Sequence, residues 1–467
     1  MTQRTRRGIA PLAVATLLVV GGAACTSERV AAPARELKPP VLRVVSPTDS
    51  GYDLDGDSLV DLELAWTDSG DAVRAAGARV RALTGVNGPG GDTVNLLDHW
   101  HVERRDASGL LAHETLDYLL HGGPNRLEVT VPDTAGNVAV DTVTFTLPYA
   151  ALVKTIASGI TDGLPATGIA LCADDHRVYM PVQGALVIVD ADSQRLVRVV
   201  PQRYPGFQLW NPLCSPGDPI LYVTSDYALQ RFNRPTGLWL PQVPPYGSDG
   251  IAQSRAEPDL LYIGWAGGII GIVSRSAGSA VGSLIPLNLL GSYGYFISSL
   301  AVPANGTKVY AAEYYDGVWV VDRRRNIVLD SISVGDSSYY GEVQSLALTR
   351  DDSRLYAAVT YGYPRGLAEI DTRTDRRART LSINPWAGIR LALSPDEQRI
   401  FLTTQDANGQ QSSNVLIDIP TWRVIQYLPR PRPAGSGRMD VGVVFHPDGR
   451  HIFVTHDRDL DIYLNRP

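Results

Sequence analysis

The chain carries a repeat whose successive units lie 40 to 52 residues apart, and this repeat constrains the fold more than any other feature. In each unit a turn-prone segment runs into a short apolar strand that has an aromatic residue at the same position. These aromatic residues are Tyr179, Tyr222, Tyr262, Tyr310, Tyr356, Phe401 and Phe453. A sustained period of this length is typical of repeat architectures, in which each unit packs against its neighbours.

The unit around Tyr356 shows the internal order of a repeat. Alternating apolar residues predict strands at 343–348 and 354–359, and shorter strands follow at 367–370 and 379–383. Four short strands separated by Asp, Gly and Pro turns are the pattern of a β-propeller blade.

An aspartate follows the third predicted strand in four of the units. A side chain at this position can accept hydrogen bonds from its own backbone turn, so we interpret these residues as structural. They are Asp190, Asp322, Asp371 and Asp418.

Two of the repeated segments carry a family resemblance. Leu221–Ser225 (LYVTS) and Ile452–His456 (IFVTH) resemble the Tyr-Val-Thr-Asn repeats of seven-bladed bacterial propellers. The similarity covers about residues 151–467 and implies a seven-bladed propeller. It does not imply one activity, because related propellers include surface proteins, ligand binders and a lactonase.

The two ends of the repeat region predict how the ring closes. The last unit has strands at 441–445, 451–455 and 460–464, and its fourth strand is missing. Residues 152–156 form a strand that precedes the first unit. We expect this strand to complete the last blade, because closure removes two exposed sheet edges.

Residues 1–25 have the features of an export signal. Arg4, Arg6 and Arg7 precede an apolar segment that is too short for a comfortable membrane span. Ala23-Ala24-Cys25 resembles the lipobox of bacterial lipoproteins, which implies lipidation at Cys25 and a membrane anchor; the alternative is ordinary cleavage near Ala24. Residues 26–40 are rich in Ala, Pro and charge and predict a flexible tether.

Residues 41–149 predict a separate module. Alternating strands occur at 62–66 and 138–147, and about 105 residues of such strands fit a β-sandwich. The Asp133–Asn137 hairpin (DTAGN) resembles bacterial immunoglobulin-like surface domains, which usually space or present another domain. The predicted fold is therefore all-β, with an immunoglobulin-like β-sandwich followed by a seven-bladed propeller at 150–467.

Alternating acids within this module suggest a calcium loop. Four carboxylates around one glycine could surround a hard cation. An ordinary solvated acidic turn remains the alternative, because no helix follows and Leu64 occupies the position of the usual twelfth-position Glu. The candidate Ca²⁺ ligands are Asp53, Asp55, Asp57 and Asp61.

Two cysteines occupy equivalent positions in neighbouring units. Cys172 and Cys214 end the first strands of the first two blades. A disulfide is plausible in an exported protein. Two buried thiols are equally plausible, because inner strands of adjacent blades can lie too far apart for the bond.

The loops between the second and third strands, and those entering each blade, are unusually aromatic. Tyr and Trp offer rigid contact area with a polar group, which suits a peptide, glycan or protein partner; the alternative is packing between blades. The candidate ligand-binding residues are Trp210, Tyr246, Trp265, Tyr293, Tyr295, Tyr314, Tyr315, Tyr339, Tyr340, Tyr361, Tyr363 and Trp386.

The net charge and the motifs that do not occur argue against several classes of function. The formal net charge of −7 comes without a basic stripe, which argues against nucleic-acid binding. No serine-hydrolase elbow, zinc-protease motif or phosphate-binding loop occurs. We expect a cell-envelope binding or scaffold protein. The alternative is a hydrolase or lyase of lactones or glycans, with or without a metal, that uses loop carboxylates; these are Asp249, Glu313, Asp316, Glu342 and Asp440.

Overall fold

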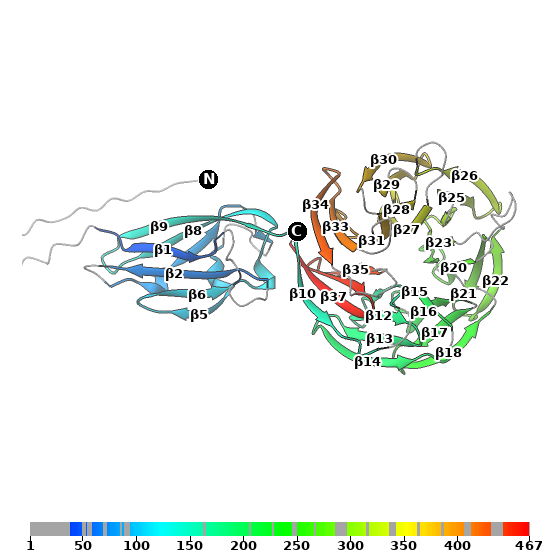
Figure 1. The fold of residues 1–467 in the computed structure, drawn as a ribbon, viewed down its shortest axis with the longest axis horizontal. Coiled ribbons are helices and arrows are strands. Elements are labelled where there is room, and N and C mark those ends of the chain that lie inside the picture. The colour runs from blue at the N-terminus through cyan, green and yellow to red at the C-terminus, as the bar shows by residue number, and fades with distance from the viewer. Residues whose placement is uncertain are drawn as a thin grey trace, which may run out of the picture.

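The computed structural model is built from strands, and the prediction of an all-β fold is confirmed. The structure describes residues 38–48, 53, 58–68, 72–84, 86–87, 94–161, 165–204, 207–226, 228–244, 250–265, 268–284, 297–313, 317–335, 342–361, 365–383, 387–405, 412–430 and 442–466. The strands fall into an N-terminal module and a ring of sheets, which lie side by side in an elongated molecule (Figure 1). No helix among the described residues has the length and apolar character needed to cross a membrane.

The N-terminal module contains two main sheets. One has the order β1-β2-β6-β5, with β1 (Val41–Ser46), β2 (Asp61–Thr67), β5 (His101–Arg105) and β6 (Gly109–His113). The other has the order β3-β8-β9, with β3 (Arg79–Ala82), β8 (Gly123–Pro132) and β9 (Val138–Leu147). The short elements are the pair β4 (Val86–Asn87) and β7 (Leu119–Leu120) and the single turns η1 (Ala75–Gly77), η3 (Leu96–Asp98) and η4 (Leu116–Tyr118).

One apolar core joins the two sheets of this module. Trp66 of β2 and Phe145 of β9 are both buried in it, together with Leu127 of β8. Buried residues alternate with more exposed ones along β8, which is the period expected of a strand with one face on a core.

Among the described residues of the ring, seven four-stranded antiparallel sheets follow one another. The first three consist of β11 (Ala170–Cys172), β12 (Arg177–Val182), β13 (Ala185–Asp190) and β14 (Arg195–Pro201); β15 (Leu209–Cys214), β16 (Ile220–Ser225), β17 (Leu229–Asn233) and β18 (Leu238–Val243); and β19 (Ile251–Gln253), β20 (Leu260–Trp265), β21 (Ile269–Ser274) and β22 (Ser279–Leu284).

The next three sheets repeat this order. They consist of β23 (Ile297–Ala301), β24 (Lys308–Glu313), β25 (Gly317–Asp322) and β26 (Ile327–Ile332); β27 (Glu342–Leu348), β28 (Arg354–Tyr361), β29 (Gly366–Asp371) and β30 (Arg376–Ser382); and β31 (Ala387–Leu393), β32 (Arg399–Gln405), β33 (Ser412–Asp418) and β34 (Arg423–Arg430).

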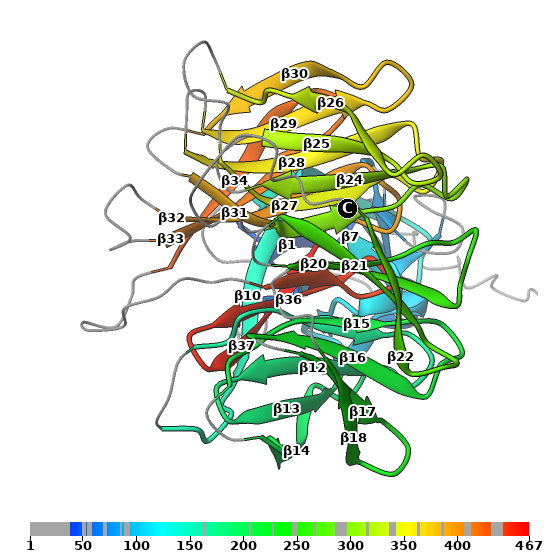
Figure 2. The ribbon, with the colours of Figure 1, turned by 90° about the vertical axis from the view of Figure 1, so that its right-hand side faces the viewer.

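The seventh ring sheet combines the two ends of the repeat region. Its strands are β35 (Val443–Phe445), β36 (His451–His456), β37 (Asp459–Asn465) and β10 (Ala150–Ile156). β10 pairs antiparallel with β37, from Ala150 opposite Asn465 to Ile156 opposite Leu460. A strand from before the first repeat therefore supplies the outer edge of the last sheet, and β10 lies beside β37 in the side view as well (Figure 2).

The strands of one ring sheet differ in burial, because inner strands pack between neighbouring sheets and outer strands face solvent. The second strands β12, β16 and β24 are buried along nearly their whole length, because both of their faces meet neighbouring sheets. The outer strands β14 and β30 contain no fully buried residue: each begins and ends exposed and is partly buried in between. Each of the aromatic residues that mark the repeat lies in a second strand and is at most 2% exposed.

Repeated polar contacts hold neighbouring sheets together. The Tyr222 hydroxyl donates to Asp218 Oδ2 at 3.0 Å, and Arg275 of the next sheet lies 2.7 Å from the same carboxylate oxygen. Burial and the nearby Asp218 charge raise the pKa of Tyr222 to about 12. The pattern recurs one sheet earlier, where the Tyr179 hydroxyl donates to Asp175 Oδ2 at 2.7 Å and Arg234 lies 2.8 Å from the same oxygen.

The aspartates after the third strands form the turns that the sequence predicted. Asp190 accepts a hydrogen bond from the Ser193 backbone N–H, and Asp322 accepts from the N–H groups of Arg324 and Arg325. Asp371 and Asp418 accept from Arg373 and Thr421 in the same way. These carboxylates are used by local turn chemistry.

The first two ring sheets are joined covalently. A disulfide links Cys172 at the end of β11 to Cys214 at the end of β15, with a Cα–Cα distance of 5.4 Å. Of the two alternatives that the sequence left open, the structure has the bonded form.

Replacing Cys172 and Cys214 together by alanine should lower the free energy of unfolding by about 2–4 kcal/mol, because a cross-link across a sequence separation of 42 residues restricts the unfolded chain. Chemical denaturation of the double variant measures this loss. The control is wild-type protein unfolded with a reducing agent, which should lose a similar amount. An unchanged denaturation midpoint in both samples would show that the disulfide has no effect on stability.

The residue that follows β37 reaches into the N-terminal module. The Arg466 side chain is 1% exposed and pairs with Glu114, whose side chain is fully buried, at 2.9 and 3.0 Å. Arg466 also donates to the backbone carbonyls of Ser58 and Leu120, while Glu114 accepts from the Val60 N–H at 3.0 Å. The ring and the N-terminal module therefore share a buried ion pair.

Candidate functional site

A small cavity lies on the axis of the ring, where the first strands of all seven ring sheets meet. Its volume is about 170 Å³. Its described lining residues lie in or just before β11, β15, β19, β23, β27, β31 and β35. They are Gly168, Ile169, Asn211, Pro212, Leu213, Gly250, Ile251, Ser298, Ser299, Ser345, Arg390, Leu391, Gly442 and Val443.

Six of the fourteen described lining residues are Gly or Ser, because the first strands crowd together on the axis. A Cβ atom on Gly442 would lie 2.9 Å from Ile169 and 3.0 Å from the backbone of Gly168. A Cβ atom on Gly250 would lie 3.0 Å from the Ile297 carbonyl oxygen. Glycine at these positions is therefore required by close backbone approach.

Part of the polar lining links neighbouring sheets. Ser298 Oγ donates to the Val343 carbonyl at 2.6 Å, and Ser299 Oγ accepts from the Leu346 N–H at 3.1 Å. These two hydroxyl groups therefore serve packing at the centre of the ring as well as lining the cavity.

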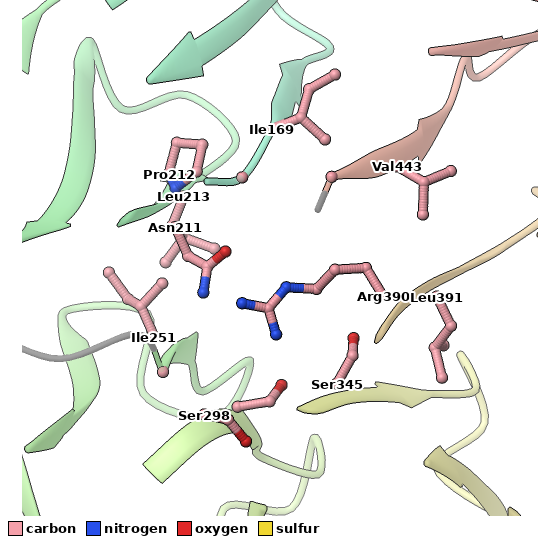
Figure 3. A pocket seen from close by; sticks show the side chains of 14 residues that line it. Ile169, Asn211, Pro212, Leu213, Ile251, Ser298, Ser345, Arg390, Leu391 and Val443 are labelled. Carbon is pink, nitrogen blue, oxygen red and sulfur yellow. The ribbon is translucent and has the colours of Figure 1, made fainter. Parts of the chain in front are cut away.

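Arg390 of β31 is the one charged residue among the described residues that line the cavity. Figure 3 shows its guanidinium in the middle of the lining, extended toward Asn211 with Ser298 and Ser345 below it. Its Nη1 donates to the Gln344 carbonyl of the neighbouring sheet. No Asp, Glu or His occurs among the described residues that line the cavity, so this lining carries a positive charge.

The cavity lies toward one edge of the ring, which we call the loop edge. Here the first and third strands of each sheet begin and the second and fourth strands end. The opposite edge, with the tight turns between the first and second and between the third and fourth strands, is the turn edge. Gly168, Gly250 and Gly442 directly precede or closely approach the starts of their first strands, so the cavity belongs to the loop edge.

The described aromatic candidates lie at this same edge. Trp210 is near the start of β15, Trp265 ends β20, and the backbone of Tyr361 ends β28. Trp210 is half-buried and its Nε1 donates to Asp226 Oδ1 at 2.9 Å, so its indole is anchored by the protein. Trp265 is also half-buried.

The remaining aromatic candidates lie outside the described residues. They are Tyr246, Tyr293, Tyr295, Tyr314, Tyr315, Tyr339, Tyr340, Tyr363 and Trp386.

The candidate calcium loop is described at two of its four acids. Asp53 Oδ2 accepts a hydrogen bond from the Ser58 N–H at 2.8 Å. Asp61 is buried, and its Oδ1 lies 2.5 Å from His113 Nδ1. Asp55 and Asp57, like the lipidation candidate Cys25, lie outside the described residues. Calcium binding therefore stays a prediction.

Two of the five loop carboxylates proposed for a catalytic alternative are described. Glu313 ends β24 and Glu342 begins β27; both are buried, and neither lines the cavity. Glu342 Oε1 accepts from Gln344 Nε2 at 2.5 Å, which places this carboxylate in the packing of β27. Asp249, Asp316 and Asp440 lie outside the described residues.

Sequence reasoning missed Arg390, although the repeat contains a signal for it. Arg390 pairs with Thr403, two residues after the marker Phe401. In the two preceding sheets the corresponding positions hold Ser345 and Ser299. An arginine at a first-strand position where two other repeats have serine is unusual, because these strands are crowded on the axis. This difference between the repeats could have identified Arg390 from the sequence.

Comparison with known proteins supports the fold. No protein-family model and no curated protein matches the chain. A WD40 propeller chain in the crystal structure of the mitotic checkpoint complex is similar to it, with a TM-score of 0.54 and 14% sequence identity. The match covers 67% of this chain and 91% of that chain. The propeller prediction is thereby confirmed at the level of the fold, and at this identity the likeness shows the fold alone.

Proposed function

We propose that this protein is a binding or scaffold protein of the bacterial cell envelope. In this proposal an immunoglobulin-like sandwich presents a seven-bladed propeller with Tyr-Val-Thr-Asn-type repeats, and the ligand binds at the loop edge. The observation that carries the proposal is the axial cavity, where the Arg390 guanidinium lies near Asn211, Ser298 and Ser345 and no Asp, Glu or His is found in the described lining. Such a lining offers hydrogen bonds and charge for recognition, and it favours binding over acid–base chemistry.

The chemistry of the cavity favours a protein or peptide partner. An arginine guanidinium forms charge-assisted hydrogen bonds with carboxylates, so an acidic side chain or a C-terminal carboxylate fits Arg390. Aromatic side chains at the loop edge would add contact area around it, as Tyr and Trp do in protein interfaces. The structural likeness to a propeller from a multiprotein complex points to the same class of partner. A glycan is the other class of ligand that the aromatic residues suit.

Peptide and glycan arrays probed with the purified protein, with and without calcium, test this proposal directly. Peptides with acidic side chains or free C-termini should bind, and binding should weaken when Arg390 is replaced by glutamine. Amidated copies of the same peptides are the matched control. An array without binders, together with turnover of a lactone or glycan, would favour the enzymatic alternative instead.

The proposed location rests on the N-terminal sequence. Arg4, Arg6 and Arg7, an apolar segment and Ala23-Ala24-Cys25 fit a lipoprotein signal, which would place a lipid on Cys25 and leave residues 26–40 as a tether.

The full-length protein expressed in a bacterium should incorporate labelled fatty acid and sediment with membranes. Cys25→Ala should abolish labelling, because the thiol that accepts the lipid is absent, and should release the protein or block its processing. A soluble wild-type protein whose N-terminus lies beyond Cys25 would contradict the anchor.

A further inference from the structure

Three turns at the turn edge bring two histidines and an aspartate together where the first and seventh ring sheets meet. His176 lies in the turn between β11 and β12, Asp192 in the turn between β13 and β14, and His446 in the turn between β35 and β36. His176 Nδ1 is 3.2 Å from Asp192 Oδ2, and His446 Nε2 is 3.4 Å from Asp192 Oδ1. One ligand atom from each of the three residues lies within 4.8 Å of the other two.

We propose that His176, Asp192 and His446 form a Zn²⁺ site that fastens the seam between the first and the seventh ring sheets. Asp192 Oδ1 lies 3.4 Å from His176 Nδ1 and 3.4 Å from His446 Nε2. A tetrahedral zinc ion with ligand bonds of about 2.0–2.2 Å holds its ligand atoms about 3.4 Å apart, which matches both distances. Two imidazoles and one carboxylate are donors that suit this ion. The His176 and Asp192 side chains are each 59% exposed, so water can supply the fourth ligand.

The surroundings of His446 match those of a metal-binding histidine. Its Nδ1 lies 2.9 Å from Asp448 Oδ2, and this carboxylate is held in place by the Arg450 N–H at 2.7 Å. When Nδ1 donates to Asp448, the lone pair of Nε2 points toward Asp192, and a histidine that binds zinc is oriented in the same way.

A second group of possible ligands, His446, Asp448 and His451, fits a supporting role better. Asp448 accepts hydrogen bonds from two backbone N–H groups, those of Arg450 and His451, and therefore shapes the turn. The His451 side chain is only 11% exposed and lies 3.1 Å from the same carboxylate. Asp448 and His451 therefore hold the His446 ring in place behind the proposed zinc site.

The location gives the ion a structural consequence. The seventh ring sheet is completed by β10 from outside the repeat region, and the disulfide joins only the first and second sheets. The proposed ion would link the first ring sheet to the seventh, because it is bound by His176 and Asp192 of the first sheet and by His446 of the seventh. Zinc should therefore stabilise the closed ring, because it binds residues that meet only there.

Isothermal titration of the full chain with zinc chloride tests the proposal, with an affinity tag that contains no histidine. Wild-type protein should bind one Zn²⁺ per chain, and its melting temperature should rise with zinc and return with EDTA. His176→Ala and Asp192→Asn should each weaken zinc affinity by at least about tenfold, and Asp448→Asn by about tenfold or more, since supporting carboxylates have effects of that size. His99→Ala, which removes an exposed histidine of the N-terminal module, is the matched control and should bind zinc as the wild type does.

Melting temperatures measured in EDTA show whether a variant binds zinc weakly because it lacks a ligand or because it is less stably folded. His176→Ala and Asp192→Asn should melt in EDTA as the wild type does, because both side chains are exposed at turns. X-ray absorption at the zinc edge of the wild type gives an independent measurement and should show nitrogen and oxygen ligands from two imidazoles and a carboxylate. Absence of stoichiometric binding would overturn the proposal, as would zinc affinity that survives His176→Ala and Asp192→Asn. Affinity that depends only on His446, Asp448 and His451 would place the ion elsewhere and overturn it too.

Discussion

Replacing Arg466 by methionine should destabilise the protein by about 3–5 kcal/mol, the usual cost of removing one partner of a buried ion pair. The variant leaves the Glu114 carboxylate buried without its guanidinium partner, although the N–H groups of Val60 and Leu120 remain bonded to it. Because Arg466 comes from the end of the ring and Glu114 from the N-terminal module, the loss should appear first in the melting of the N-terminal module. Calorimetry with separate fluorescence or exchange probes in the two parts measures this effect.

The matched control is the double variant Arg466→Met with Glu114→Gln. Removing both charges avoids an unpaired buried carboxylate. The Gln amide keeps only one acceptor oxygen for the Val60 and Leu120 N–H groups, but losing one neutral hydrogen bond costs less than burying a lone charge, so the double variant should be more stable than Arg466→Met alone. A single variant that melts as the wild type does would show that the ion pair does not join the two parts. A double variant less stable than the single variant would contradict the burial argument.

Replacing β10 by a Gly-Ser segment of equal length should abolish cooperative unfolding of the ring and cause aggregation. The change keeps the chain length between the two parts but removes the strand that pairs with β37 from Ala150 to Ile156. It also removes Ala150 and Ile156 from the cores that the seventh ring sheet shares with its two neighbours. The freed edge of β37 would then be available for pairing with other molecules.

The control for this variant is the same replacement in β22, the outer strand of the third ring sheet. The described side chains of β22 are exposed, and β22 does not join the two ends of the ring. This control also frees a sheet edge, that of β21, but it leaves the ring closed, so its unfolding should stay cooperative with a moderately lower melting temperature. Light scattering and calorimetry distinguish the two outcomes. Equal behaviour of the two variants would mean that β10 is an ordinary outer strand and not the closure of the ring.

The repeated features, and the ring closure that follows from counting their strands, were predictable from the sequence, whereas contacts between single residues far apart in the chain were not. Tyr222 and its equivalents recur because each sheet needs the same aromatic residue in its second strand, so their spacing reports the packing directly. The pairing of β10 followed from counting strands, because the last repeat lacks one. The disulfide between Cys172 and Cys214 stayed open, since it depends on a distance between two sheets that no spacing along the chain determines.

The single residues with the strongest individual contacts escaped prediction for the same reason. Arg466 looks like an ordinary terminal arginine until its place against Glu114 is known, because these residues are far apart in the sequence. The grouping of His176, Asp192 and His446 depends on ring closure, which brings the first and last repeats together. The aromatic candidates were chosen by composition alone, and only Trp210, Trp265 and the backbone of Tyr361 can be placed at the loop edge.

The most direct test of the central claim, that the loop edge binds the partner, is a titration of the best array ligand against matched variants. Arg390→Gln, Tyr314→Ala and Tyr340→Ala should weaken its affinity by about 1–3 kcal/mol each, or roughly 5- to 150-fold. The two tyrosine variants should change the melting temperature little, and Arg390→Gln should lower it by no more than the loss of its hydrogen bond to the Gln344 carbonyl explains. Arg373→Ala, on a turn at the opposite edge, should bind as the wild type does, while Tyr356→Ala should lower the melting temperature because it removes a buried core ring. Unchanged affinity in the Arg390, Tyr314 and Tyr340 variants, or melting as early as that of Tyr356→Ala, would contradict the proposed binding face.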